Sequence, residues 1–192
     1  VNSFIDQLRS CDPQKAVLYD GSRSVTAGEL YNDSRRLAVS MLQSGIQKGD
    51  RVLMALPPGA DFLKIIYASM FAGTVVAIID PEMGHGNFNS KLRQFSPLHV
   101  FADSRLGFMN EHPLIKFMIL RFRKNLPSLP HIPRCNLFTA GLRLPVFQKH
   151  LHLNTLLGHE YPAPDFVRAD THDEFLVIYT SGTLAEPKGV VH

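Results

Sequence analysis

Residues 51–79 carry the pattern that most constrains the fold, because a strand, a helix and a second strand follow one another there. Arg51–Leu56 is a nearly continuous apolar run of the length of a short buried strand. Ala60–Ala72 has helical length and stands between helix-breaking prolines and glycines. Thr74–Ile79 is apolar and β-branched and ends at an Asp-Pro pair. This succession predicts parallel strands covered by helices.

The flanking segments extend the same architecture. Thr26 and Glu29 have the spacing of a capping box, in which each side chain accepts a hydrogen bond from the other residue's backbone. They predict a helix over Thr26–Gly45, which the glycine can close. Three further segments fit the pattern, namely a helix at Asn87–Phe95 and strands at His99–Ala102 and Phe175–Tyr179. The expected fold class is α/β, with a mainly parallel sheet flanked by helices.

Composition limits the classes of function. Hydrophobic residues make up 45% of the 192 residues and charged residues 19%, a balance typical of a globular protein. The net charge of +3 is too small by itself to predict a nucleic-acid partner. Cys11 and Cys135 show no metal-ligand or disulfide spacing, which favours a cytoplasmic location. The nearly apolar run Ile65–Ile79 is shorter than the roughly 20 residues of a membrane-spanning helix.

Charge and proline content divide the chain into three expected portions, 1–104, 105–160 and 161–192. The first is the α/β portion described above. The second is expected to be a basic insert interrupted by prolines, since from residue 105 to residue 149 Glu111 is the single acid. The third contains the strand Phe175–Tyr179 and the loop that follows it.

This loop carries the most informative chemistry in the sequence. It runs Thr-Ser-Gly-Thr-Leu-Ala-Glu-Pro-Lys-Gly and follows directly from a predicted buried strand. Its hydroxyl groups, exposed N–H groups, glycines and lysine are the groups that cradle a polyphosphate at the carboxyl edge of a sheet. It is not a Walker A loop, whose glycine and lysine spacing differs. From chemistry alone, a plain Ser/Thr/Gly turn remains the alternative.

The loop resembles the signature of the adenylate-forming, or AMP-binding, superfamily. That group includes acyl-CoA synthetases, fatty acyl-AMP ligases and the adenylation domains of peptide synthetases. The resemblance covers about Phe4 to Ala102 and again Glu174 to His192. Its upstream motifs are Val25–Leu30, Arg36–Ala38, Gly49–Val52, Ala72–Val76 and Ile79–Pro81.

The resemblance implies a ligase that forms an acyl-adenylate from ATP and a carboxylic acid and releases pyrophosphate. A second step passes the acyl group to a thiol of coenzyme A or of a carrier-protein pantetheine. The loop would hold the β- and γ-phosphates of ATP, which carries Mg²⁺. The implied phosphate-contacting residues are Thr180, Ser181, Gly182, Thr183, Lys188 and Gly189.

The resemblance also implies what this chain does not contain. The family's adenine-binding stretch, its ribose-binding Asp, its Mg²⁺-binding Glu and its C-terminal domain with a catalytic Lys would follow His192. Residues 1–192 are therefore expected to form only part of the N-terminal AMP-binding domain, with no catalytic residue and no metal ligand. The isolated chain is expected to be inactive. The His150-x-His152 pair has no cysteine or acid cluster beside it and predicts no zinc site.

One position departs from the family pattern. Leu184-Ala185 stands where the family usually has Thr-Gly, so a hydroxyl donor and a flexible glycine are replaced. We expect the loop to be stiffer or to bind phosphate more weakly.

The basic portion offers a second interpretation. Drawn as a helix, Leu114–Lys124 gathers its basic residues towards one side and most of its apolar residues on the other. Such a helix can contact an anionic membrane surface, although a solvated surface helix has the same pattern. Peripheral membrane contact would suit a fatty acid substrate. The alternatives are an adenylation domain for an amino acid and a non-catalytic fragment that binds membrane surfaces.

Overall fold

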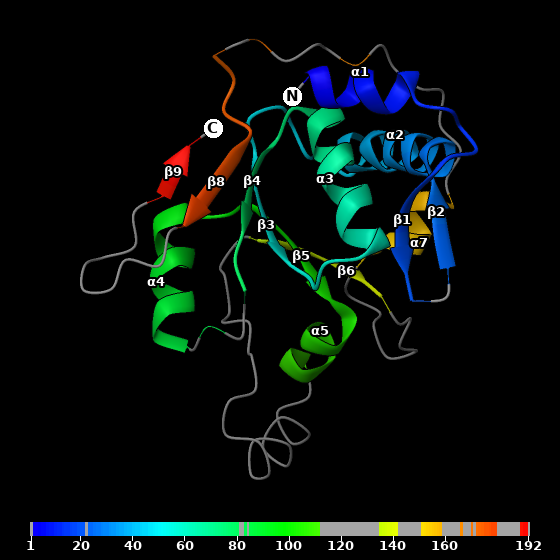
Figure 1. Ribbon diagram of the computed structural model, residues 1–192. Helices are drawn as coiled ribbons and strands as arrows, with labels where there is room; N and C mark the ends of the chain where they lie inside the picture. The colour runs from blue at the N-terminus through cyan, green and yellow to red at the C-terminus, as the bar shows by residue number, and fades with distance from the viewer. Residues whose placement is uncertain are drawn as a thin grey trace.

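A seven-stranded sheet forms the centre of the computed structural model (Figure 1). The structure describes residues 2–21, 23–80, 83, 85–111, 135–141, 151–158, 166, 170, 172–179 and 189–191. The strand order is β7-β6-β5-β3-β4-β8-β9. All neighbouring pairs are parallel except β8 and β9, which are antiparallel. The strands are β3 (Arg51–Ala55), β4 (Val75–Ile78), β5 (His99–Asp103), β6 (Asn136–Ala140), β7 (Leu151–His152), β8 (Leu176–Tyr179) and β9 (Gly189–Val191).

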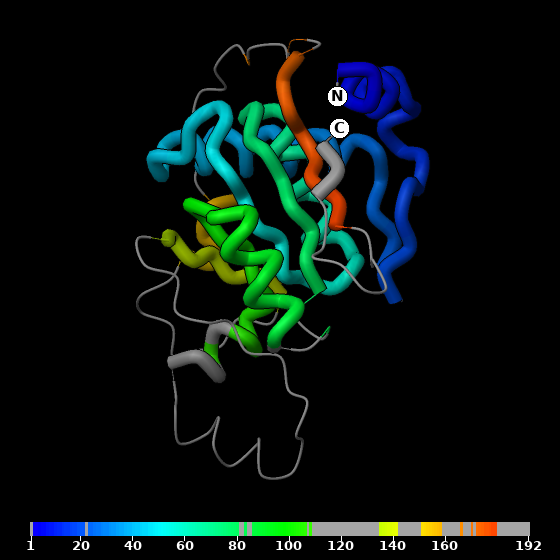
Figure 2. Tube along the Cα trace, turned by 90° about the vertical axis from the view of Figure 1, so that its left-hand side faces the viewer, coloured from blue at the N-terminus to red at the C-terminus, as the bar shows by residue number. Residues whose placement is uncertain are grey.

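Helices cover both faces of this sheet (Figures 1 and 2). One face packs against α2 (Ala27–Gln43), α3 (Ala60–Ala72) and α7 (Leu153–Leu157), with α1 (Asn2–Ser10) in contact with α2 and α3. The other face packs against α4 (His85–Phe95) and α5 (Ser104–Glu111). A separate antiparallel hairpin, β1 (Ala16–Asp20) and β2 (Arg23–Thr26), leads into α2. The result is a three-layer α/β arrangement.

The core consists of one apolar cluster on each face of the sheet. Leu37, Met41 and Ile65 are fully buried between the α2–α3 layer and the strands. Phe101 of β5 stacks on Phe138 of β6 with ring centroids 4.8 Å apart. These contacts hold the strands together. Because β3 to β8 are parallel, their carboxyl ends lie at one edge of the sheet.

The predicted elements are confirmed with end shifts of one to a few residues. The capping box forms as expected, because Thr26 N donates to Glu29 Oε2 at 2.9 Å and Glu29 N donates to Thr26 Oγ1 at 3.2 Å. Thr74 was expected in a strand but belongs to the turn before β4, where its N–H donates to Ser69 O at 3.1 Å. Gly73 takes a left-handed φ of +69° at the end of α3, a conformation that favours glycine.

The sequence analysis predicted no strand between residues 105 and 160, yet β6 and β7 lie in the central sheet there. The predicted division into portions 1–104, 105–160 and 161–192 stays a prediction. The basic segment Leu114–Lys124 lies outside the described residues, so the membrane contact inferred from it also stays a prediction. In the part of the chain that the structure describes, no helix has the length and apolar character needed to cross a membrane.

A buried ion pair joins α2 to α3. Lys64 Nζ lies 2.8 Å from Asp33 Oδ2, and Arg36 donates to Asp33 Oδ1 at 2.6 Å. Burial raises the pKa of the Asp33 carboxyl, but the hydrogen bonds from Lys64 and Arg36 outweigh it, so the pKa lies below its usual value. The pair therefore contributes stability above the pKa of unfolded Asp, and this contribution is lost as the pH falls through the lowered pKa.

We expect Lys64→Met to reduce the free energy of unfolding by about 1–3 kcal/mol at pH 7, because Asp33 would lose one of its charged partners in a buried site. The difference from the unmodified chain should shrink as the pH falls from the pKa of unfolded Asp through the lowered pKa of folded Asp33, because the carboxyl then loses its charge in the folded chain as well. Urea unfolding at pH 7 and pH 3 measures both effects. Lys48→Met is the control, because Lys48 pairs with Asp173 at an exposed site and should cost less. Equal losses for both variants would contradict this account.

Candidate phosphate-binding site

The predicted loop connects two paired strand ends at the carboxyl edge of the sheet. β8 runs parallel to β4, and β9 returns antiparallel to β8 with Gly189 opposite Tyr179. Residues 180–188 therefore start and finish at the same point of this edge. Gly189 is placed as the first residue of β9. The other predicted contact residues lie outside the described residues and are Thr180, Ser181, Gly182, Thr183 and Lys188.

Contacts with the helical layer hold the segment that leads into β8. The ring of Phe166 packs against Phe71 with centroids 5.1 Å apart, and the guanidinium of Arg35 lies 5.7 Å from the centroid of the Phe166 ring. Lys48 Nζ pairs with Asp173 Oδ2 at 2.7 Å. Val76 N then donates to the carbonyl oxygen of Phe175 at 2.7 Å, which starts the pairing of β8 with β4. The loop thus leaves from a strand that the core supports.

Tyr179, the last residue of β8, contacts a lysine that the sequence analysis did not single out. Lys91 Nζ of α4 lies 5.6 Å from the centroid of the Tyr179 ring. Burial raises the pKa of the Tyr179 phenol, and the Arg51 guanidinium opposes that shift. The raised pKa keeps the phenol neutral at pH 7, so Lys91 faces a neutral aromatic ring. The sequence does not show that Lys91 is buried, because most lysines on amphipathic helices are exposed to solvent.

Carboxylates at the same edge are occupied by structural contacts. Gly141 N donates to Asp61 Oδ2 at 3.1 Å, which ties the end of β6 to the start of α3. Arg105 donates to both oxygens of Asp103, at 2.8 and 2.9 Å. Burial raises the pKa of Asp103, but these hydrogen bonds outweigh it and the pKa lies below its usual value. Among the described residues, no group of three His, Cys, Asp or Glu side chains could hold a metal ion.

Of the two histidines considered as zinc ligands, the structure describes His152. His152 ends β7, and its Nδ1 accepts a hydrogen bond from Asn154 N at 3.1 Å, which caps α7. His150 lies outside the described residues. The two cysteines are free, and burial raises the pKa of the Cys135 thiol to about 11, so it is protonated at pH 7. Cys135 therefore does not supply a reactive thiolate at pH 7.

The sheet and the sequence of the loop after β8 together indicate a class of protein. A parallel sheet with helices on both faces, and a loop of hydroxyl groups, glycine and lysine after one strand, is an arrangement typical of domains that bind phosphorylated ligands. The model of the AMP-binding enzyme family matches residues 6–192, so this chain belongs to that family.

Individual relatives agree with this assignment. A peroxisomal butyrate–CoA ligase from Arabidopsis thaliana is 28% identical over 98% of this chain and 33% of its own length. An acetoacetyl-CoA synthetase from Danio rerio is 26% identical over 96% of this chain and 29% of its own length. The crystal structure of the anthranilate CoA ligase AuaEII with anthranoyl-AMP superposes with a TM-score of 0.74 at 18% identity, over 99% of this chain and 34% of that chain. The chain therefore spans about a third of the length of these proteins.

Proposed function

We propose that the protein containing this chain activates a carboxylic acid with ATP. The acid's carboxylate oxygen attacks the α-phosphorus, the bond to the β,γ-phosphates breaks, and pyrophosphate leaves. A thiol of coenzyme A or of a carrier-protein pantetheine then attacks the acyl carbonyl, and AMP leaves. The observation that carries this proposal is the family loop between β8 and β9 at the carboxyl edge of the sheet.

In this proposal the loop binds and positions the polyphosphate. Backbone N–H groups and hydroxyls of the loop donate hydrogen bonds, and the Lys188 ammonium neutralises charge that builds up on the leaving pyrophosphate. Mg²⁺ would enter bound to ATP, and its protein ligand would lie outside residues 1–192. The contacting residues are Thr180, Ser181, Gly182, Thr183, Lys188 and Gly189. Leu184 and Ala185 supply less hydrogen bonding and less flexibility than the Thr-Gly of the family pattern.

A fatty acid is the proposed acid. Two curated relatives are named for joining a short carboxylic acid, butyrate or acetoacetate, to coenzyme A. An amino acid is the alternative, since adenylation domains of peptide synthetases belong to the same superfamily. Long-chain, short-chain and amino acids differ in size and charge at the acyl group, so a substrate panel separates them directly.

The test is product analysis on the protein that contains this chain. We expect that incubation with ATP, Mg²⁺, coenzyme A and fatty acids of increasing length releases AMP and yields one acyl thioester per AMP. Mass spectrometry of the thioester and chromatography of the nucleotides measure the two products. Product with free amino acids alone would move the assignment to the amino acid branch. Release of ADP instead of AMP, with any acid, would contradict adenylation.

A further inference from the structure

Strand β8 joins β4 through a short ladder that fixes its register only weakly. Two register pairs form, Val76 with Leu176 and Ala77 with Val177. Val76 N also donates to the carbonyl oxygen of Phe175 at 2.7 Å. The residues of β8 are all apolar or aromatic, so either face of the strand could be turned towards the core.

A shift of β8 by two residues keeps its faces and brings Ile178 beside Val76 in place of Leu176. Ile178 is 43% exposed in the observed register, whereas Val76 is fully buried. The shift would bury an isoleucine and expose a leucine, so burial of these two side chains hardly distinguishes the registers. A shift in the other direction would bury the charge of Glu174 beside Val76 and is opposed by that cost. One direction of movement is therefore left open by the apolar pattern.

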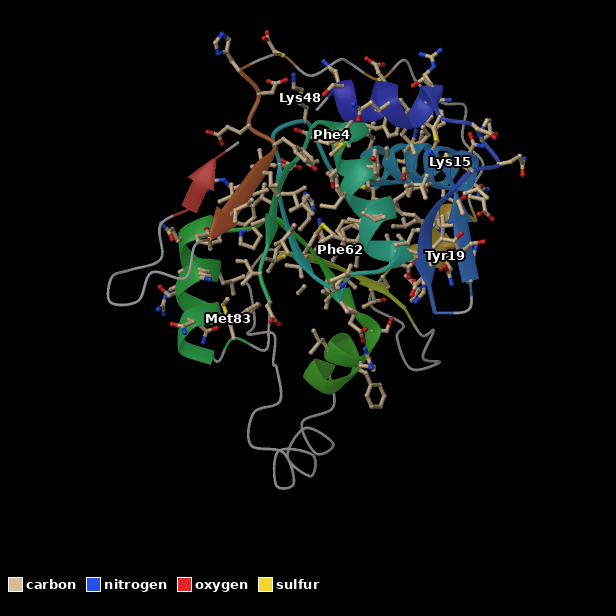
Figure 3. The ribbon with its side chains drawn as sticks, in the orientation of Figure 1. Phe4, Lys15, Tyr19, Lys48, Phe62 and Met83 are labelled. Carbon is tan, nitrogen blue, oxygen red and sulfur yellow. The ribbon has the colours of Figure 1, made fainter. Side chains whose placement is uncertain are left out.

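An ion pair at the start of β8 opposes this movement. Lys48 Nζ lies 2.7 Å from Asp173 Oδ2, which also accepts a hydrogen bond from Asp170 N at 2.7 Å. The hydrogen bond from Lys48 holds the pKa of the Asp173 carboxyl below its usual value, so the pair is ionic at pH 7. Figure 3 shows Lys48 at the end of the molecule where the chain enters β8. A shift of two residues would move Asp173 by about 6.6 Å and break the pair.

The stem of Lys48 is packed against the turn before β4, so the ammonium cannot freely follow such a movement. A Cβ atom on Gly73 would lie 2.9 Å from Lys48 Cγ, which places the lysine stem directly on the glycine. Gly49 N donates to Gly73 O at 2.8 Å, and Val75 N donates to Asp50 O at 2.9 Å. These bonds tie the segment that carries Lys48 to the start of β4.

We propose that the ion pair between Lys48 and Asp173 selects the register of β8 against β4. Exposed ion pairs are weak, and we expect this one to favour the observed register by about two- to fivefold. A weak contact can decide here because the apolar pattern is nearly neutral between the two registers. Residue 180 directly follows Tyr179, so the register of β8 also sets where the predicted loop begins. The inference concerns the sheet and stands whether or not that loop binds phosphate.

Hydrogen exchange at two neighbouring amides of β4, measured by NMR on the 192-residue chain, tests the effect of the ion pair. The Val76 amide is bonded to Phe175 O and reports on the β8 side of β4. The Val75 amide is bonded to Asp50 O, directly before β3, and reports on the other side. A change confined to β8 should therefore appear at Val76 and not at Val75.

Two substitutions remove the ion pair from opposite partners. Lys48→Met and Asp173→Asn each remove one charge, and the asparagine keeps an oxygen that can accept from Asp170 N. We expect each to speed exchange at Val76 by about two- to fivefold and to leave Val75 unchanged. The double variant should exchange no faster than either single variant, because both remove the same contact. Lys48→Arg keeps the charge and should stay within about twofold of the unmodified chain.

The register itself is read from contacts of the Ala77 methyl group. Ala77 is the register partner of Val177 in the observed structure, and Tyr179 would take that place after the shift. In Lys48→Met and Asp173→Asn, nuclear Overhauser contacts of the Ala77 methyl group should therefore pass in part from Val177 to the Tyr179 ring.

Lys64→Met is the contrasting control, because it breaks the buried pair between α2 and α3. It should speed exchange at both amides alike, through lower global stability, and leave the methyl contacts unchanged. The inference is overturned if loss of the ion pair leaves exchange at Val76 unchanged, speeds both amides equally, or speeds Val76 with the Ala77–Val177 contact fully intact. Selective exchange at Val76, the new contact with the Tyr179 ring and recovery in Lys48→Arg together support it.

Discussion

Replacing Lys188 with alanine in the protein that contains this chain should slow acid-dependent adenylate formation by about 10²–10³-fold. Lys188 is the single basic residue between positions 180 and 188. Its ammonium would stabilise charge that develops on the departing pyrophosphate, and a contact of this kind counts most in the transition state. Single-turnover measurement of adenylate formation at saturating ATP separates this loss in rate from weaker ATP binding.

Lys15→Ala is the control for this substitution, because Lys15 is exposed on another side of the molecule and should leave the rate unchanged. A Lys188→Ala protein that forms adenylate at the normal rate, with correct folding shown by thermal unfolding, would remove the loop lysine from the proposed mechanism. The adenylation reaction itself could still hold in that case, with charge stabilised by other groups.

The second large effect concerns the 192-residue chain expressed without further sequence, which should form no detectable adenylate. It spans about a third of the length of its curated relatives, and we expect it to lack groups that bind adenine, ribose and Mg²⁺. Each lost hydrogen bond to a charged group costs about 1.5–3 kcal/mol, and every 1.4 kcal/mol is tenfold in affinity. We therefore expect millimolar or weaker ATP binding, measured by calorimetry.

Pyrophosphate exchange on the same chain tests its inactivity. The chain carrying Lys188→Ala serves as background, because any contaminating enzyme would be unaffected by that substitution. Exchange above this background would mean that residues 1–192 contain everything the reaction requires. The partners assigned to later sequence would then be dispensable, and the inactivity proposed for the isolated chain would be wrong.

Most of the central fold could be predicted because local signals and burial agree there. The run Ala60–Ala72 is bounded by glycine at both ends, and the structure places α3 over the same residues. The capping box at Thr26 and Glu29 marks the start of α2 through purely local hydrogen bonds. Parallel pairing followed from the lengths of the connecting segments, which suit helical crossovers.

The strands β6 and β7 could not be predicted in the same way. β6 has only five residues beside a proline-rich stretch, and β7 has two. Their pairing depends on the neighbouring strand and on contacts distant in sequence, such as the stacking of Phe138 on Phe101. Propensity alone is weak for such short strands, because tertiary packing decides them.

Motif and hydroxyl content single out residues 180–189 in the sequence, and their role in binding phosphate stays a prediction. The structure adds the pairing of Tyr179 with Gly189 at the two ends of this loop, which the sequence did not indicate. The burial of Lys91 against Tyr179 depends on how α4 packs on the sheet. A sequence cannot distinguish this lysine from a solvated one, since burial is a property of the folded chain.

Exchange of radiolabelled pyrophosphate into ATP tests the central claim most directly, because it requires reversible formation of an acyl-adenylate. With the protein that contains this chain, we predict exchange that depends on a carboxylic acid and on Mg²⁺ and that falls by about 10²–10³-fold in Lys188→Ala. Thiol is not needed for this half-reaction, so the result is independent of the acceptor. Hydrolysis of ATP to ADP and phosphate, with no exchange for any acid in the panel, would contradict the account.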